Sequence, residues 1–197
     1  MLTQLATVKA RLGIPPAQTK DDVTLTGFIN LVSNRFDAHC NRKFEREEGA
    51  TYDFCASDRE IIPLRLPIES VTGFAVQSSA REGWVTMEDV DYFIRAAGEA
   101  PTIISLAAAL GPEASLARLT YTGGYVLPGA TPSAGQTALP SDLEVACQEQ
   151  VCFLYQSKDR LGLGSVQGAG GSIQTFPQID LLPSVKQVLR FYERWAN

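Results

Sequence analysis

The sequence predicts an α+β protein: a helical bundle of about four helices with an antiparallel β region inserted between helices two and three. Apolar residues recur at helical spacing near both ends of the 197-residue chain, as in amphipathic helices. Between the ends, short β-prone runs alternate with glycine, proline and charged turns, which is typical of five to seven antiparallel strands. The expected parts are a discontinuous helical core, 1–42 and 138–197, an inserted β region, 43–127, and a linker, 128–137.

The first two helices are expected before residue 42. Residues 3–12 form a short helix, with Thr3 as its cap and Gly13 as its end. A longer helix runs from about Asp21 to Cys40, because its apolar residues repeat every three or four positions. Those apolar residues are Leu25, Phe28, Ile29, Val32 and Phe36.

The last two helices are expected after the linker. Ser141 and Glu144 have the S-x-x-E spacing of a capping box, and Gly162 ends the helix that follows. Pro183 opens the final helix, since proline is tolerated in a first turn, where its missing N–H would have no partner. The apolar side of this helix carries Val185, Val188, Leu189, Tyr192 and Trp195, and its basic side carries Lys186, Arg190 and Arg194.

A glycine-rich run, "GLGSVQGAGGSIQTF", covers residues 162–176. A phosphate-binding loop needs its glycines between a strand and a helix, so that the helix amides meet the phosphate. This run follows a helix instead, and its spacing matches neither G-x-G-x-x-G nor G-x-x-x-x-G-K-[ST]. We therefore expect a flexible surface loop over residues 162–180, and no nucleotide site.

Catalysis by histidine has one candidate, His39, because the chain holds one histidine. A Cys–His nucleophile pair needs both side chains within hydrogen-bond reach, whereas neighbours such as His39 and Cys40 point about 100° apart on a helix. A zinc site would need His39, Cys40 and Cys55 to converge with a fourth ligand, and no spacing indicates that. The expectation is no catalytic residue, no metal and no cofactor.

Charged residues indicate a solvated surface. The formal net charge is −5 and the sequence pI is near 4.9, which disfavours a protein that grips nucleic acid through its phosphates. Acidic residues cluster at Asp21 and Asp22, within residues 45–48, and at "EDVD", 88–91. Paired carboxylates can serve acid–base catalysis, but clusters at helix caps and turns are typical of exposed surface charge.

The N-terminal stretch has neither a basic leader before an apolar run nor a cleavage site, and no apolar run reaches the length of a membrane span. We therefore expect no signal peptide and no membrane association. Cys40, Cys55, Cys147 and Cys152 fit reduced, buried thiols of a protein made in the cytoplasm.

Three aromatic residues crowd the C-terminal end in "FYERW", 191–195. They cannot all lie on one narrow helical face, so Tyr192 and Trp195 share the core side while Phe191 points elsewhere. One interpretation is a broad buried face. The other is a terminal helix that buries its second side on a partner, through Arg190, Phe191 and Arg194.

Five motifs follow one another along the chain: "LATVKARLGI", "DDVTLTGFINLVSNRFDAHCNRKF", "LRLPIESVTGFAV", "LTYTGGY" and "LPSDLEVACQEQVCFLYQSKDRLG". Their order resembles the head–tail connector, or adaptor, proteins of tailed bacteriophages and related gene-transfer particles. The motifs extend over most of the chain, and "LPIESV", "YTGGY" and the "LPSDL" helix start are more specific in this order than each is alone. No catalytic motif belongs to such a family.

The resemblance implies a structural building block of the virion, located at the head–tail junction and made in the host bacterial cytoplasm. Family members form a ring, commonly dodecameric, beneath the portal protein. The ring extends the DNA channel, through which DNA passes without specific binding, and offers a docking platform to the next tail or stopper protein. The C-terminal segment of the family tends to engage the portal. The free protein is expected as a monomer or as a self-assembled ring.

Two other classes of function stay open at this point. One is a small enzyme that uses His39 with a nearby thiol or carboxylate, which the substitution His39→Ala would disable. The other is a cellular scaffold or adaptor with no viral link. A connector gene should lie among capsid, portal and tail genes, whereas the gene of a cellular scaffold should not.

Overall fold

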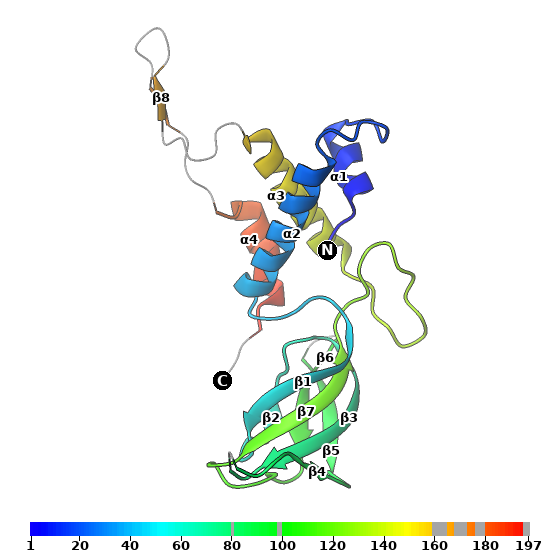
Figure 1. Ribbon diagram of the computed structural model, residues 1–197, viewed down its shortest axis with the longest axis vertical. Coiled ribbons are helices and arrows are strands. Elements are labelled where there is room, and N and C mark those ends of the chain that lie inside the picture. The colour runs from blue at the N-terminus through cyan, green and yellow to red at the C-terminus, as the bar shows by residue number, and fades with distance from the viewer. Residues whose placement is uncertain (80, 98–99, 159–164, 168–172, 176–179, 195–197) are drawn as a thin grey trace. The chain divides into compact units, whose positions relative to one another are not determined.

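The computed structural model describes residues 1–79, 81–97, 100–158, 165–167, 173–175 and 180–194. The chain divides into two compact units. The helical unit comprises Met1–Phe36 and Pro140–Tyr192, and the strand unit comprises Asp37–Leu139 and Glu193–Asn197. In Figure 1 the helices are gathered in the first unit and strands β1 to β7 in the second.

The helical unit is built on α1 (Leu5–Leu12), α2 (Asp22–His39), α3 (Ser141–Gln156) and α4 (Pro183–Leu189), and the 3₁₀ turn η2 (Arg190–Tyr192) continues α4. The last turn of α2 belongs to the strand unit. Gly13 ends α1 in the left-handed conformation, at φ 70°, with its N–H bonded to the carbonyl of Ala10. Glycine takes this conformation without the steric cost of a Cβ. Proline opens α4, as predicted.

The two predicted side-chain caps are wrong. α3 begins at Ser141 itself, and neither Gln4 before α1 nor Pro140 before α3 makes a side-chain cap bond. Instead, Thr3 Oγ1 donates to Glu144 Oε1 over 3.4 Å. The polar side chains expected to close two separate helix starts thus join the N-terminal segment to α3.

The helices bury their apolar faces against one another, with α3 packed on both α1 and α4. Each fully buried aliphatic side chain stabilises the unit by about 1.5–3 kcal/mol relative to exposure, before the entropy cost of ordering. The fully buried residues of the unit are Val8, Leu25, Ile29, Val32, Phe36, Leu143, Cys147, Gln150, Val151, Val185 and Leu189.

A buried lysine holds the connection between α1 and α2. Lys9 is 4% exposed, and its Nζ donates to the carbonyls of Pro16 and Gln18 and to Asp22 Oδ1, over 3.0, 2.7 and 2.8 Å. An ammonium has three protons to donate, so this buried charge is fully satisfied. Helical periodicity alone did not distinguish Lys9 from the exposed residues of α1.

The strand unit contains two antiparallel sheets. One has the order β1-β7-β3-β4 and the other β2-β6-β5. The strands are β1 (Glu47–Cys55), β2 (Glu60–Ile61), β3 (Ile68–Gln77), β4 (Val85–Met87), β5 (Tyr92–Ala97), β6 (Ala100–Leu106) and β7 (Leu116–Gly123). Since all pairs are antiparallel, short connections join consecutive strands without crossover helices.

The inner faces of both sheets share one core. Buried and less buried residues alternate along β7, as a strand with one core face requires. Ala117, Leu119 and Tyr121 are buried positions of β7 and lie opposite Phe54, Tyr52 and Ala50 of β1. Ile61, Ile104 and Leu106 of the second sheet belong to the same core cluster. Sheets packed face to face in this way form a sandwich.

The predicted helical bundle with an inserted β region is wrong. α1 and α4 have 8 and 7 residues, about two turns each, which is too short for the long helices of a bundle. The strands form a separate compact unit with a core of their own. Helical periodicity located the helices, but it does not show over how many residues a helix face is buried or which element packs against that face.

The pair Gly123–Gly124 of "YTGGY" lies where backbone segments approach closely. A Cβ on Gly123 would lie 2.6 Å from the carbonyl oxygen of Arg65, and one on Gly124, whose φ is +102°, would lie 2.6 Å from that of Glu45. Real Cβ atoms essentially never come so close. Both positions therefore require glycine.

Two predicted irregular segments complete the description. Residues 128–137 contain no helix or strand. The predicted glycine-rich loop, 162–180, lies largely outside the described residues. Its expected flexibility therefore stays a prediction. Within it, β8 (Ser165–Gln167) pairs antiparallel with β9 (Ile173–Thr175).

Candidate functional site

His39 has a carboxylate beside it but no reactive thiol. Its Nε2 lies 3.7 Å from Glu193 Oε1. Cys40 is fully buried, and desolvation raises the pKa of its thiol to about 12, so the nucleophilic thiolate does not form near neutral pH. The structure thus places an imidazole beside a carboxylate, while burial keeps the neighbouring thiol protonated.

Burial also disfavours the thiolate of two further cysteines. Desolvation raises the pKa of Cys147 to about 12 and raises the pKa of Cys152. Cys55 is half-buried, and its Sγ lies 3.2 Å from the Glu113 carbonyl. Among the described residues, no group of three or more His, Cys, Asp and Glu side chains could hold a metal ion.

Two of the three acidic clusters bond to other residues of their own unit. Arg46 Nε donates to both carboxylate oxygens of Glu69 and its Nη1 to Glu48. Asp21 accepts hydrogen bonds from Tyr155 and Lys158, and the bond from Tyr155 is the largest cause of its lowered pKa. These carboxylates stabilise the fold, and their distribution does not resemble an acid–base pair facing a substrate.

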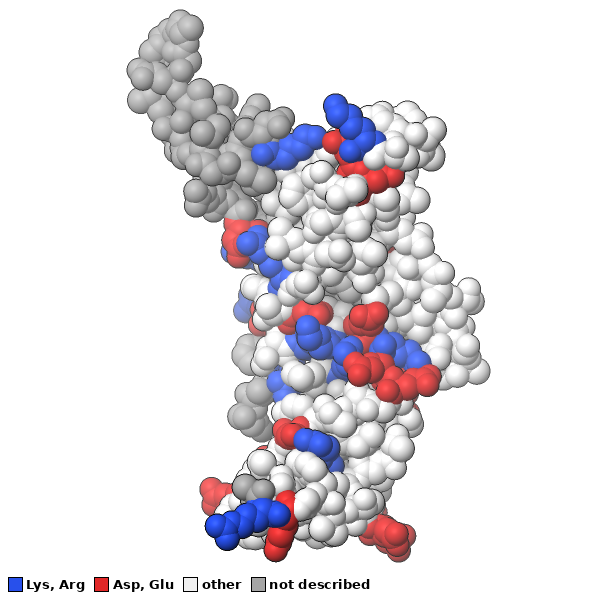
Figure 2. Space-filling model, in the orientation of Figure 1, with Lys and Arg blue, Asp and Glu red and all other residues white. Residues whose placement is uncertain are grey.

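The third cluster, residues 88–91, connects β4 to β5 and is different. Glu88, Asp89 and Asp91 are exposed, and none of them forms an ion pair with a residue that the structure describes. On the face drawn in Figure 2, acidic and basic side chains lie next to each other, without a continuous basic patch on the described residues in view. Nucleic-acid binding through phosphates needs such a patch.

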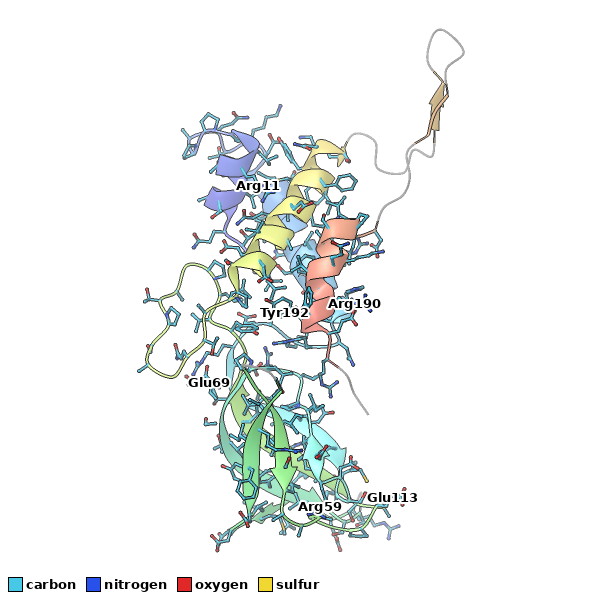
Figure 3. All side chains as sticks on the ribbon, turned by 180° about the vertical axis from the view of Figure 1, so that it is seen from behind. Arg11, Arg59, Glu69, Glu113, Arg190 and Tyr192 are labelled. Atoms are coloured by element: carbon cyan, nitrogen blue, oxygen red, sulfur yellow. The ribbon has the colours of Figure 1, made fainter. Side chains whose placement is uncertain are left out.

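The predicted partner surface, Arg190, Phe191 and Arg194, is divided between the two units. Arg190 and Phe191 lie in η2 of the helical unit, and Phe191 is 87% exposed. Figure 3 labels Arg190 beside Tyr192, whose hydroxyl donates to Asp142 of α3 over 2.8 Å. Tyr192 is therefore tied down, while Phe191 extends into solvent.

Arg194 belongs to the strand unit and acts as a clamp there. Its Nε donates to the carbonyl of Ile62 over 2.8 Å, its Nη2 to the hydroxyl of Tyr52 over 2.7 Å, and its backbone N–H to the carbonyl of Cys40. The guanidinium thus joins β1 to the segment after β2. Trp195, the next residue, lies outside the described residues.

Both units contain a cleft lined by described residues. In the helical unit, an open cleft of about 270 Å³ lies between α1, α3 and Leu182, which precedes α4, and it is lined in part by Arg11, which Figure 3 labels. In the strand unit, a cleft of about 470 Å³ lies between β1 and β2, lined in part by Tyr52, Ile61, Arg59 and Arg194. Neither is lined by His39.

Sequence reasoning missed the most buried guanidinium. Arg42 is 7% exposed, its Nη2 donates to the Leu66 carbonyl, and its guanidinium carbon lies 4.7 Å and 5.4 Å from the ring centroids of Phe44 and Tyr125. Burial lowers the pKa of Arg42. The two basic residues next to an aromatic one in "NRKF" were the only local hint, and such neighbours are too common to identify a stacked cation.

The comparisons with known proteins bear on the fold. No family model and no curated protein matches the sequence. Solved structures match it: a chain from the neck of an empty gene transfer agent (GTA) particle with C6 symmetry is 15% identical, over 98% of this chain and 90% of that chain, with a TM-score of 0.56.

Two further structures agree. A chain from the virion of a native GTA particle is 13% identical, over 98% of this chain and 90% of that chain, with a TM-score of 0.58. A chain from the neck of a native GTA particle with C12 symmetry is 14% identical, over 98% and 89%, with a TM-score of 0.56. The predicted resemblance to components of phage-like particles is confirmed at the level of the fold.

Proposed function

We propose that this protein is a structural, non-enzymatic subunit of the neck of a phage or gene-transfer particle. In this proposal its copies form a ring beneath the portal, dodecameric in the particle. The ring extends the DNA channel and offers a docking platform to the next tail or stopper protein. The observation that carries the proposal is the fold shared, over nearly the full length of both chains, with chains of GTA necks and virions.

The charge distribution supports a passive role toward DNA. A net charge of −5 and the alternation of acidic and basic side chains in Figure 2 leave little to hold phosphates. DNA that moves through a channel must break every phosphate contact that it makes with the wall. A wall that makes few such contacts therefore lets the duplex slide past. No described helix is long and apolar enough to cross a membrane.

The end of α4 supplies the contact with the portal in this proposal. Phe191 is a large aromatic side chain that folding leaves 87% exposed, and Arg190 beside it is exposed too. Aromatic and arginine side chains dominate the energy of protein interfaces. The contribution of Arg194 to the same contact stays a prediction, since its guanidinium already donates to Ile62 and Tyr52.

The decisive experiment is electron microscopy of particles made with and without the gene. We expect a ring of this protein at the head–tail junction of complete particles, and DNA-filled heads without tails when the gene is deleted. Normal tailed particles in the deletion strain would refute the proposal. His39→Ala should leave assembly intact, whereas an enzyme that depends on His39 would lose its activity.

The contact itself is tested by a matched pair of variants. Phe191→Ser should weaken attachment to the portal about tenfold or more. Val23→Ser, at a residue that is 85% exposed in the same unit, should leave attachment unchanged. Deletion of residues 183–197 should abolish attachment, but Val185 and Leu189 are core residues, so that variant needs a folding control by circular dichroism.

A further inference from the structure

The strand unit has two opposite lateral edges of different character. The sheet orders β1-β7-β3-β4 and β2-β6-β5 place β1 and β4 at the two ends of one sheet and β2 and β5 at the two ends of the other. Residues 56–59 connect β1 to β2, and residues 88–91 connect β4 to β5. One connection between the sheets therefore lies at the β1/β2 edge and another at the β4/β5 edge.

The β1/β2 edge is concave. Its cleft of about 470 Å³ is lined by Tyr52 and Phe54 from β1, Ile61 from β2, and the guanidinium-bearing residues Arg59 and Arg194. A cleft of this size lies within the range of sites that enclose a small ligand, so it can accommodate an aromatic side chain with its neighbours. The open backbone edges of two strands flank it, and such edges are available for pairing with another chain.

The cationic groups of this cleft are not neutralised by described carboxylates. Arg59 Nη2 donates to the carbonyl of Ala107 over 2.6 Å, and Arg194 donates to a carbonyl and a phenol. Glu60 is ion-paired with Arg95 on its own sheet. One carboxylate of the lining, Asp58, thus remains against two guanidinium groups. The cleft has a surplus of positive charge in a protein that is acidic overall.

The β4/β5 edge exposes apolar and acidic side chains. Val85 is 63% exposed and Phe93 65% exposed. Phe93 lies opposite Ser105, whereas its neighbours Tyr92 and Ile94 lie opposite the core residues Leu106 and Ile104. Phe93 therefore points away from the core. Beside it stand the exposed carboxylates of residues 88–91, and exposed apolar groups next to charges are typical of a contact surface.

We propose that, in the ring, the β4/β5 edge of one copy docks into the β1/β2 cleft of the next copy. This inference rests on the proposed ring. A rotational ring needs two unlike surfaces on each subunit, one for each neighbour. The two edges fulfil this need within one unit: an aromatic side chain with acidic neighbours on one side, and a cleft with two guanidinium groups on the other. Opposite charges also set the register and suppress wrong pairings.

The test places a photoreactive p-benzoylphenylalanine at Phe93 in particles assembled from the variant. Irradiation should give a product of twice the 21.4-kDa chain mass, with the probe joined to residues 52–62 of a second copy. The matched control carries the probe at Leu116, which is 50% exposed on β7 of the same unit. It should give about tenfold less of that linkage. Leu116 also faces away from the core, but β7 lies inside its sheet and at neither lateral edge.

A charge reversal gives a second readout. Arg59→Glu should lower the yield of the Phe93 linkage about tenfold, because repulsion replaces attraction toward residues 88–91. Lys20→Glu, the same charge change at an exposed residue of the helical unit, should leave the yield unchanged. A Phe93 probe that reacts only within its own copy, or with another particle protein, in particles whose ring is visible by electron microscopy would overturn this inference alone. Particles that lack the protein altogether would overturn the proposed function as well.

Discussion

Replacing Gly124 by alanine should destabilise the strand unit severely. Gly124 has φ +102°, and an added Cβ would lie 2.6 Å from the Glu45 carbonyl oxygen and 2.8 Å from Arg46 backbone atoms. Neither contact can be relieved by rotating a side chain. The segment of Glu45 and Arg46 would have to move as backbone.

The size of the effect follows from what holds that segment. A left-handed φ costs alanine about 1–2 kcal/mol relative to glycine. Moving the segment strains two backbone bonds, from Arg46 N–H to the Tyr125 carbonyl, 3.0 Å, and from Tyr125 N–H to the Phe44 carbonyl, 2.7 Å. Losing both adds about 1–3 kcal/mol. The free energy of unfolding should therefore fall by about 2–5 kcal/mol, which lowers the melting temperature of a domain this size by at least about 8 °C.

Fluorescence of Trp84 can follow the strand unit by itself. The Arg118 guanidinium carbon lies 4.0 Å from the Trp84 ring centroid, so unfolding changes the surroundings of the indole. The chain has two tryptophans, and Trp195→Phe leaves Trp84 as the sole reporter. Urea unfolding of Gly124→Ala in this background should show the lowered midpoint.

Gly73→Ala is the matched control. Gly73 lies in β3, and an added Cβ would meet nothing within 4 Å. Alanine there should be neutral or stabilise the strand by up to about 1 kcal/mol, because it restricts the unfolded chain. Equal midpoints for Gly124→Ala and Gly73→Ala would refute the close approach at "YTGGY".

Three other outcomes are expected. Lys9→Ala should lower the free energy of unfolding by about 3 kcal/mol in urea titrations, because it leaves the Asp22 carboxylate without its buried partner; a change below about 1 kcal/mol would contradict this role. Hydrogen bonds from Arg118 lower the pKa of Asp53. The stability that this pair contributes is therefore complete above the pKa of the unfolded chain, about 3.9, and is lost as pH falls through the pKa of the folded protein. Asp53→Asn should flatten the pH dependence of urea midpoints in that acid range, and an unchanged slope would argue against the pair. In thiol titration of the native protein, Cys55 should react first, while the buried thiols become reactive only in denaturant.

Local patterns made the helices and several strand positions predictable. The spacing of apolar residues in α2 and α3, Gly13 after α1 and Pro183 at the start of α4 act over a few residues, and the structure keeps them. The same spacing does not show over how many residues a helix face stays buried. The predicted helical bundle was therefore wrong, because α1 and α4 are too short to form one. Polar groups were harder still: Thr3 and Glu144, each expected at its own helix start, bond to each other.

Composition and periodicity determined which segments are helical and which are β-strands, because these properties depend on neighbours within one or two turns. They also showed that the sequence contains no nucleotide-binding motif. Tertiary structure alone decided that Arg118 meets Asp53 65 positions away, that Arg194 clamps Tyr52 and Ile62, and that an exposed aromatic side chain and a cationic cleft belong to the same strand unit. Those relations depend on strand order and register. Many strand orders share one alternating pattern, and packing of the whole core selects among them.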